Sequence, residues 1–319
     1  SVRRFNGAFK DRFKKAPRDV RKVKASRENS LKISIPYRPP FDFHGLLRSY
    51  ESHRVGDLEI FQDGKMRRIF QLNGKTGEVL IANHPESSSL TVEIDFPDTT
   101  LVLAILSRVR AMFDLDSDPV LVANALERDP SFKKTLRKYP GIRLPSGWDG
   151  FEVAVATILG QLVSVERGRI LVRDLIVLAG KDLGHAKNGE KVLFFPSAEE
   201  IVAADLTGLK TTRQRKETLK SFARAVSTGE ISLSPAQDVD EFVEKLLRIR
   251  GLGPWTAQYM AMKVLRHTDA FPGTDLVLAK ALEGRSADFL EEMSPWRAYA
   301  AALLWRRHGD AKTKLRSIE

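Results

Sequence analysis

The segment Gly251-Leu252-Gly253-Pro254 constrains the fold of this chain more than any other stretch. Apolar residues recur with helical spacing on both sides of it, so it must turn the chain between two helices within a few residues. Glycine adopts backbone angles that other residues avoid, and proline is favoured at the first position of a helix. We therefore predict a helix over Val239–Leu247, a tight hairpin, and a second helix over Trp255–His267.

The hairpin has a chemical implication as well as a structural one. Its glycines let the backbone approach a charged ligand closely, and the following helix presents free N–H groups and the positive end of its dipole, so a phosphate of a nucleic acid fits there. Further along, Phe271-Pro272-Gly273-Thr274-Asp275 opens another helix and places a carboxylate at its start. Taken singly, such a turn is often only a connection and such an aspartate only an N-cap. Together they indicate a site.

The combination resembles the helix-hairpin-helix DNA glycosylase superfamily, in which a catalytic aspartate follows the hairpin beyond a proline-containing loop. Trp255 and Asp275 stand in that relation. Further segments narrow the resemblance to the 3-methyladenine DNA glycosylase II (AlkA-type) family, and these segments are Ile158–Val165, Phe113–Leu115 and Pro295–Arg297 through Trp305. The resemblance extends from Tyr37 to the C-terminus.

An α+β fold follows from the pattern and from the resemblance together. Short β-rich runs separated by turn residues predict antiparallel strands at Leu31–Pro36, Leu58–Phe61, Met66–Leu72, Glu78–Ala82 and Leu90–Ile94. A helix over Phe41–His53 should pack on one face. The resemblance implies that these elements form a small domain of the TATA-binding-protein-like kind, followed by a mainly α-helical glycosylase core in two lobes.

Beyond Thr99 the chain has helical periodicity almost to its end. The remaining predicted helices are Thr99–Phe113, Pro119–Glu127, Phe132–Tyr139, Asp149–Leu162, Ser164–Ala179, Ser197–Ala204, Gln214–Ser227, Asp275–Glu283 and Trp296–Arg307. We place the α/β domain at residues 31–98, one helical lobe at residues 99–146 plus 266–319, and the lobe with the hairpin at residues 147–265. A loop near Lys181–Lys191, rich in Gly and Lys, is expected to be a flexible insertion.

Residues 1–30 differ from the rest in charge. They hold eleven Lys or Arg against three Asp or Glu, and so account for eight of the eleven net positive charges. Phe5, Phe9 and Phe13 form one apolar stripe of a helix. The segment is similar to the end of an AraC-type helix-turn-helix regulator, so we expect a remnant of that domain and a basic linker, partly disordered, from a longer fusion.

Composition excludes several classes of protein. The chain has no cysteine, which rules out disulfides, a cysteine nucleophile and a thiolate metal site. No apolar run is long enough to span a bilayer, and the basic N-terminus lacks an apolar core, so no membrane partner is expected. The net positive charge of the chain favours binding to a polyanion. With the resemblance, this implies double-stranded DNA as partner, a monomer, and a bacterial cytoplasmic location.

The resemblance assigns the chemistry to Asp275. Breaking an N-glycosidic bond leaves positive charge on the sugar, which a nearby carboxylate can stabilise, and the same carboxylate could instead orient or deprotonate the attacking water. Trp255, Tyr259 and Trp305 match positions that line the pocket for an extruded base, with Trp305 stacking on it. Aromatic residues on helices more often pack in the core. Trp296 is expected to do so.

The DNA contacts are also carried over from the family. Leu162 matches the side chain that fills the gap left by the extruded base, although alone it would pass for a buried leucine. The other expected DNA-binding residues are Gln161, Gly251, Gly253 and Thr256. No cofactor is required, but the backbone carbonyls of Leu247, Ile249 and Gly251 match a family site for a monovalent cation.

The favoured activity is a monofunctional glycosylase that releases alkylated purines, 3-methyladenine foremost. Bifunctional relatives carry a Lys where Trp255 stands, and only an amine can form a Schiff base with the sugar. Two alternatives stay open: a non-catalytic DNA-binding regulatory module of the alkylation response, and a lyase-type glycosylase for oxidised bases. Leu276 and Pro254 depart from the family pattern at positions often held by an aromatic and a basic residue.

Overall fold

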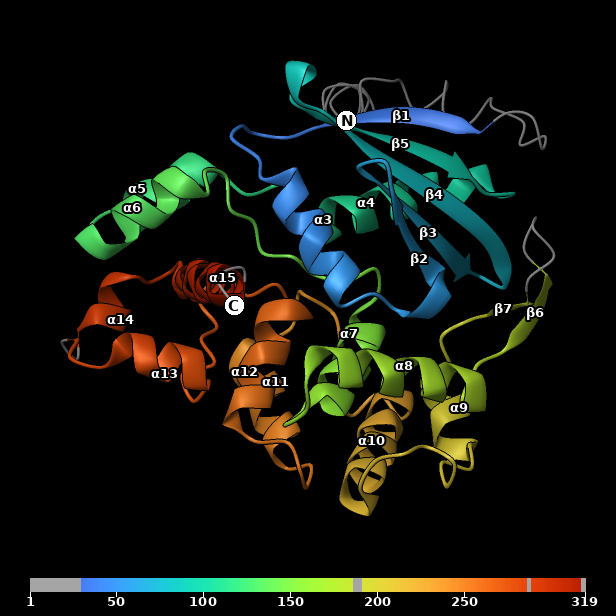
Figure 1. Ribbon diagram of the computed structural model, residues 1–319. Helices are drawn as coiled ribbons and strands as arrows, with labels where there is room; N and C mark the ends of the chain where they lie inside the picture. Colours follow the sequence, from blue (N-terminus) through green and yellow to red (C-terminus); the bar gives the residue numbers. More distant parts are fainter. Residues whose placement is uncertain (1–29, 186–190, 286–287, 317–319) are drawn as a thin grey trace.

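The computed structural model describes residues 30–185, 191–285 and 288–316. The expected helix-turn-helix remnant and basic linker at residues 1–30 lie almost wholly outside the described residues. Within them, a five-stranded sheet with helices on one face leads into a body of helices (Figure 1). The predicted α+β class is therefore confirmed.

The sheet is antiparallel throughout, with the strand order β1-β5-β4-β3-β2. Side chains of alternate residues point to one face, and there Ile33, Ile35, Val79 and Ile81 are fully buried. Asp63-Gly64 and Asn73-Gly74 connect strands with positive φ at each residue, as two-residue hairpin turns require. The strands are β1 (Leu31–Pro36), β2 (Glu59–Gln62), β3 (Lys65–Leu72), β4 (Lys75–His84) and β5 (Ser89–Asp95).

Helices α3 (Phe43–Ser52) and α4 (Val102–Met112) cover the buried face of the sheet (Figure 1). The ring of Phe43 stacks on that of Phe113 with 5.7 Å between centroids. The hydrophobic cluster under the sheet thus continues through α4, beyond the domain boundary at residue 98 that the sequence predicts. Three single turns of 3₁₀-helix lie in this part of the chain, at Gly56–Leu58, Pro85–Ser87 and Thr99–Leu101.

The rest of the chain is mainly helical. Oxygen atoms of side chains at the N-caps satisfy free N–H groups at the start of many helices, which explains why the helices begin where they do. The helices are α5 (Pro119–Leu126), α6 (Pro130–Lys138), α7 (Gly150–Gly160), α8 (Val165–Ala179), α9 (Ala198–Ala203), α10 (Arg213–Ser227), α11 (Val239–Leu247), α12 (Pro254–Lys263), α13 (Leu276–Leu282), α14 (Phe289–Glu292) and α15 (Arg297–Arg316).

Two helix boundaries differ from the sequence prediction. Helix α12 ends at Lys263 rather than His267, and Arg266 adopts a left-handed backbone conformation with φ of 57°. Helix α14 was not expected, because four residues are too few to show a helical period. Helix α15 continues to Arg316, nine residues beyond the predicted end at Arg307. The remaining predicted helices are confirmed to within a few residues.

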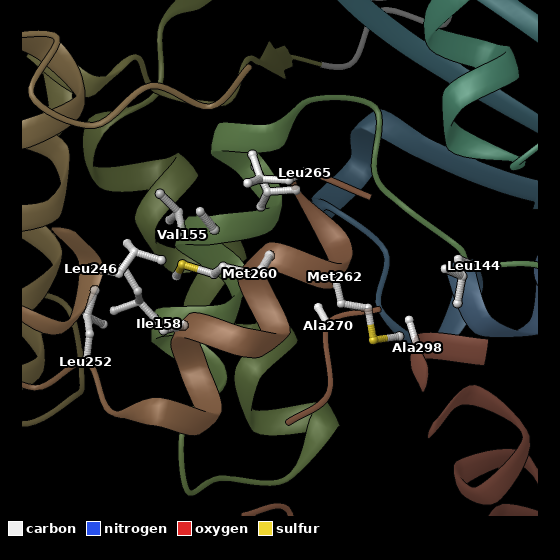
Figure 2. Close-up of a cluster of buried hydrophobic side chains, with 14 of the residues drawn as sticks. Leu144, Val155, Ile158, Leu246, Leu252, Met260, Met262, Leu265, Ala270 and Ala298 are labelled. Carbon is white, nitrogen blue, oxygen red and sulfur yellow. The ribbon is translucent and has the colours of Figure 1, made fainter. Parts of the chain in front are cut away.

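Helix α7 lies at the centre of the helical body and contacts α8, α10 and α12. It is apolar on nearly every face, as a helix surrounded by others must be. Figure 2 shows Val155 and Ile158 of α7 beside Met260 of α12, with Leu246 of α11 and Leu252 of the hairpin itself completing this part of the core. The hairpin is thus anchored in the core by its own buried leucine.

The segment expected to be a flexible loop near Lys181–Lys191 has regular structure at its base. Strands β6 (Asp182–His185) and β7 (Lys191–Leu193) pair antiparallel, while residues 186–190 between them lie outside the described part. The sequence hid this hairpin because its Gly and Lys residues show no alternation of apolar and polar positions. Among the described helices, none is long and apolar enough to cross a bilayer.

A buried ion-pair cluster joins the sheet to the helical body. The guanidinium of Arg68 on β3 lies 3.0 Å from the carboxylate of Glu59 on β2 and 2.5 Å from that of Glu152 on α7. Arg68 is only 1% exposed. Burial raises the pKa of Glu152 to about 7, although the charge of Arg68 acts in the opposite direction. The two carboxylates therefore depend on this one arginine.

The substitution Arg68→Met tests that dependence. It should lower the free energy of unfolding by roughly 3–5 kcal/mol, because it leaves two buried carboxylates without their counter-charge. The matched control is Lys32→Met, since Lys32 pairs with Glu93 on the surface of the same sheet at 2.8 Å, and its loss should cost less than about 1 kcal/mol. Urea denaturation of both variants decides the matter, and equal losses would contradict a special role for Arg68.

Candidate active site

Asp275 is the N-cap of helix α13, and its side chain does more than cap. Oδ1 accepts hydrogen bonds from the backbone N–H groups of Val277 at 2.9 Å and Leu278 at 3.1 Å. The preceding turn is closed by the N–H of Asp275 donating to the carbonyl of Pro272 at 2.9 Å. The carboxylate therefore stands at the positive end of the α13 dipole, in a fixed orientation.

Two indole N–H groups complete the surroundings of this carboxylate. Nε1 of Trp255, near the start of α12, donates to Oδ2 of Asp275 at 3.2 Å, and Nε1 of Trp305, in α15, donates to Oδ1 at 3.0 Å. Three elements far apart in the sequence thus meet at one side chain. Asp275, Trp255 and Trp305 are each partly exposed, so the group is open to solvent on one side.

The third predicted pocket residue, Tyr259, lies between the two tryptophans. Its ring stacks on Trp255 with 5.1 Å between centroids and an interplanar angle of 16°, and meets Trp305 edge-on at 5.9 Å. Burial, and then the charge of Asp275, raise the pKa of Tyr259 to about 12, so its hydroxyl stays neutral. The structure therefore brings the predicted catalytic residue, Asp275, together with all three predicted pocket residues.

Lys263 lies behind this aromatic group and is held there. Its Nζ donates to the carbonyl of Pro145 at 2.6 Å and lies 5.8 Å from the centroid of the Tyr259 ring. Burial lowers the pKa of Lys263 to about 8. Trp296, which is expected to pack in the core, is partly buried against the main hydrophobic cluster.

Leu162 is an exposed apolar side chain, and its predicted contact with DNA stays a prediction. It follows helix α7, adopts a left-handed conformation with φ of 53°, and is 102% exposed relative to a reference chain. A buried leucine, the ordinary interpretation, is excluded. Among the described residues it is the most exposed of the large apolar side chains, ahead of Leu276 at 87%.

Gln161 and Thr256 turn inward. The amide nitrogen of Gln161 donates to the carbonyl of Gly251 at 3.1 Å and to Oγ1 of Thr256 at 2.7 Å. The side chain of Thr256 is buried, at 2% exposure. The side chain of Thr256 is therefore not open to a DNA ligand, and its predicted DNA contact, through the backbone N–H, stays a prediction. Gln161 joins the turn that carries Leu162 to the hairpin.

The hairpin has the conformation that its glycines predict. Gly251 is exposed with φ of 95°, a region that other residues rarely adopt. Gly253 is the N-cap of α12 and Pro254 its first residue, and a Cβ added at Gly253 would meet nothing within 4 Å. Ala257 makes the bond to the carbonyl of Gly253 at 3.0 Å, so the N–H groups of Trp255 and Thr256 precede the first helical bond.

The three carbonyls proposed for a cation remain compatible with that role. Leu247 is the last residue of α11, where carbonyls lack helical partners. The carbonyl of Ile249 accepts from the N–H of Leu252 at 3.0 Å, and that of Gly251 accepts from Gln161. A carbonyl oxygen has two lone pairs, so each retains one for a hard monovalent cation.

The amino-acid sequence of this chain is similar to those of known DNA repair proteins. The family model "AlkA N-terminal domain" matches residues 32–149. A probable bifunctional transcriptional activator/DNA repair enzyme AlkA of Mycobacterium tuberculosis is 30% identical over 96% of this chain, which spans only 64% of that protein's length. DNA-3-methyladenine glycosylase 2 of Escherichia coli is 29% identical over 86% of this chain and 97% of its own length.

A third curated relative and one solved structure are also similar to this chain. DNA-3-methyladenine glycosylase of Bacillus subtilis is 30% identical over 63% of this chain and 71% of its own length. The solved structure of a 3-methyladenine DNA glycosylase from Archaeoglobus fulgidus superposes with a TM-score of 0.72, at 19% identity, over 85% of this chain and 96% of that one. At that identity the superposition shows a shared fold.

The bonds at Asp275 can be tested through stability and spectra. Asp275→Ala removes an N-cap and leaves two indole N–H groups without their acceptor, so it should cost about 2 kcal/mol of unfolding free energy. Asp238→Ala is the control, since Asp238 caps α11 through the N–H of Glu241 at 2.9 Å, and it should cost only about 1 kcal/mol.

The indole Nε1–H resonances give the second readout for the same pair of variants. The protein has four tryptophans. Asp275→Ala should shift the resonances of Trp255 and Trp305 and leave those of Trp148 and Trp296 in place, because only the first two donate to Asp275. Unmoved resonances, or an equal cost for both variants, would disprove the bonding described here.

Proposed function

The chain belongs to the AlkA-type family of DNA-3-methyladenine glycosylases, and from this premise we propose that it is a monofunctional DNA glycosylase. It hydrolyses the N-glycosidic bond of alkylated purines, 3-methyladenine foremost, in double-stranded DNA, and acts as a monomer. The observation that carries the proposal is the Asp275 carboxylate, partly exposed and held among three aromatic side chains.

Asp275 is suited to the charge that develops in this reaction. When the bond between C1′ and the base nitrogen breaks, the base leaves with the electron pair and the sugar becomes an oxocarbenium ion. Water then adds to C1′ and loses a proton. Oδ1 of Asp275 already accepts three hydrogen bonds and Oδ2 only one. Oδ2 is therefore the oxygen that can face the sugar or the water.

The aromatic side chains supply a site for a cationic base. Purines methylated at N3 or N7 carry positive charge, which is attracted to the faces of indole and phenol rings. Tyr259 remains a neutral phenol because its pKa is raised to about 12. Such a base leaves readily, so the reaction needs no dedicated general acid. This agrees with a site built around one carboxylate.

The exposed Leu162 and the hairpin support a duplex as the substrate. Extruding a base costs a few kcal/mol of stacking, and a protruding apolar side chain fills the gap that remains. Leu162 is such a side chain, because it is apolar and fully exposed to solvent. The N–H groups around Gly253 would hold a phosphate, and a monovalent cation on the carbonyls of Leu247, Ile249 and Gly251 would add positive charge beside it.

The absence of an amine at position 255 supports hydrolysis without strand cleavage. Trp255 cannot form a Schiff base, and Lys263 donates to the carbonyl of Pro145 behind Tyr259. A purely regulatory DNA-binding module would not need a carboxylate oriented by two indoles. Both considerations favour the monofunctional enzyme over its alternatives.

Asp275→Asn tests the catalytic role. Excision of base from methylated duplex DNA should fall roughly 100-fold or more, since the amide cannot stabilise a cation, whereas DNA affinity should be unchanged or slightly higher because one negative charge is lost. Asp238→Asn, at the other N-cap, should excise normally. Unchanged release of base by Asp275→Asn would exclude this mechanism.

Borohydride trapping tests the absence of lyase chemistry. Reduction of a Schiff base would give a covalent complex between protein and damaged DNA, and we expect none, with an abasic site as the product. Trp255→Lys is an instructive companion, because an amine there could generate a trapped complex. A complex formed by the unaltered protein would refute monofunctional action.

A further inference from the structure

The turn that carries Leu162 has weak local support. The N–H of Gln161 meets the carbonyl of Ile158 at 3.4 Å, and the N–H of Val163 meets that of Gly160 at 3.5 Å, both at the long end of hydrogen-bond distances. Leu162 itself has φ of 53°, which is unfavourable for a leucine, and its side chain contacts no core. Such a conformation persists only when its surroundings hold it.

Arg215 of helix α10 stabilises this turn from outside. Its Nη2 donates to the carbonyl of Gln161, the residue immediately before Leu162, and its Nη1 donates to Oγ1 of Thr211 at 3.0 Å. In the described part of the chain both partners are neutral oxygens, so Arg215 forms no ion pair there. Its charge is directed at the backbone of the turn.

The same helix also holds the hairpin. Oγ1 of Thr218 lies 2.8 Å from the carbonyl oxygen of Arg250, and a Cβ added at Gly251 would come within 2.2 Å of that Oγ1. Thr218 follows Arg215 by three residues, so the two lie on one face of α10. The side chain of Gln161 connects the Leu162 turn directly to the hairpin, because its amide nitrogen donates to the carbonyl of Gly251.

We propose that Arg215 is a positioning residue, which presets the Leu162 turn and keeps it in a fixed register with the phosphate-binding hairpin before DNA arrives. The ordering of the turn is then complete in the free protein and need not be achieved on binding. This inference rests on the proposed function, because it concerns how a base is extruded from a duplex.

The test compares Arg215→Met with Arg213→Met. Both substitutions remove one positive charge from the first turn of α10, but Arg213 is 93% exposed and binds only Glu217, at 2.7 Å, among the described residues. Two rates are measured on a methylated duplex: single-turnover release of base, and the fluorescence rise of 2-aminopurine placed beside the lesion, which reports extrusion.

Arg215→Met should slow both rates roughly 10- to 100-fold, in keeping with the effect of small misplacements, while Arg213→Met should leave them unchanged. In a Leu162→Ala background, Arg215→Met should cause no further loss, because no side chain remains to be positioned. Equal losses with and without Leu162, or equal losses from the two arginines, would overturn the proposal.

Two further comparisons keep the outcome decisive. If thermal unfolding shows that Arg215→Met does not fold, Arg215→Lys replaces it. The lysine keeps the positive charge but cannot reach both acceptor oxygens. Its rates of base extrusion and release should be lower than those of the unaltered protein only when Leu162 is present. If the unaltered protein extrudes the base but releases none, the proposed function fails and the role of Arg215 is still measured by fluorescence.

Discussion

Two indole and two backbone N–H groups meet on the carboxylate of Asp275, and the arrangement around the site depends on this convergence. It ties the start of α12 to α13 and to α15. The indole edges are thereby fixed, which leaves the ring faces to define the aromatic surroundings. In the proposed reaction the tryptophans would therefore combine two roles that a phenylalanine could not: presenting a face to the base and holding the carboxylate that stabilises the sugar.

The parts that would contact DNA share one support. Arg215 and Thr218 of α10 bind the Leu162 turn and the hairpin respectively, and Gln161 links the two directly. Because hydrogen bonds across elements replace weak local ones, the Leu162 turn and the hairpin keep a constant separation. Under the proposed function, a duplex bound at the hairpin would therefore meet Leu162 at a defined step.

The sheet contributes to the same geometry from a distance. Arg68 fastens β2 and β3 to Glu152 on α7, and α7 ends at the turn that bears Leu162. A buried arginine between two carboxylates is costly to form and costly to disrupt, so it specifies one docking of sheet on helices. The sheet thus supports the central helix α7 through this buried ion-pair cluster.

The sequence by itself determined the local elements and the identity of the site. Short β-rich runs located every strand of the five-stranded sheet, and glycines located its turns and the hairpin. The resemblance of spaced motifs to a known family placed Asp275, Trp255, Tyr259 and Trp305 at one site. Only the tertiary structure decided what the side chains do there. It turned Thr256 inward, gave the indole nitrogens to Asp275, and made Arg215 the support of Leu162. Those contacts join residues 20 to 95 positions apart, and no local period can encode which distant oxygen a side chain will reach.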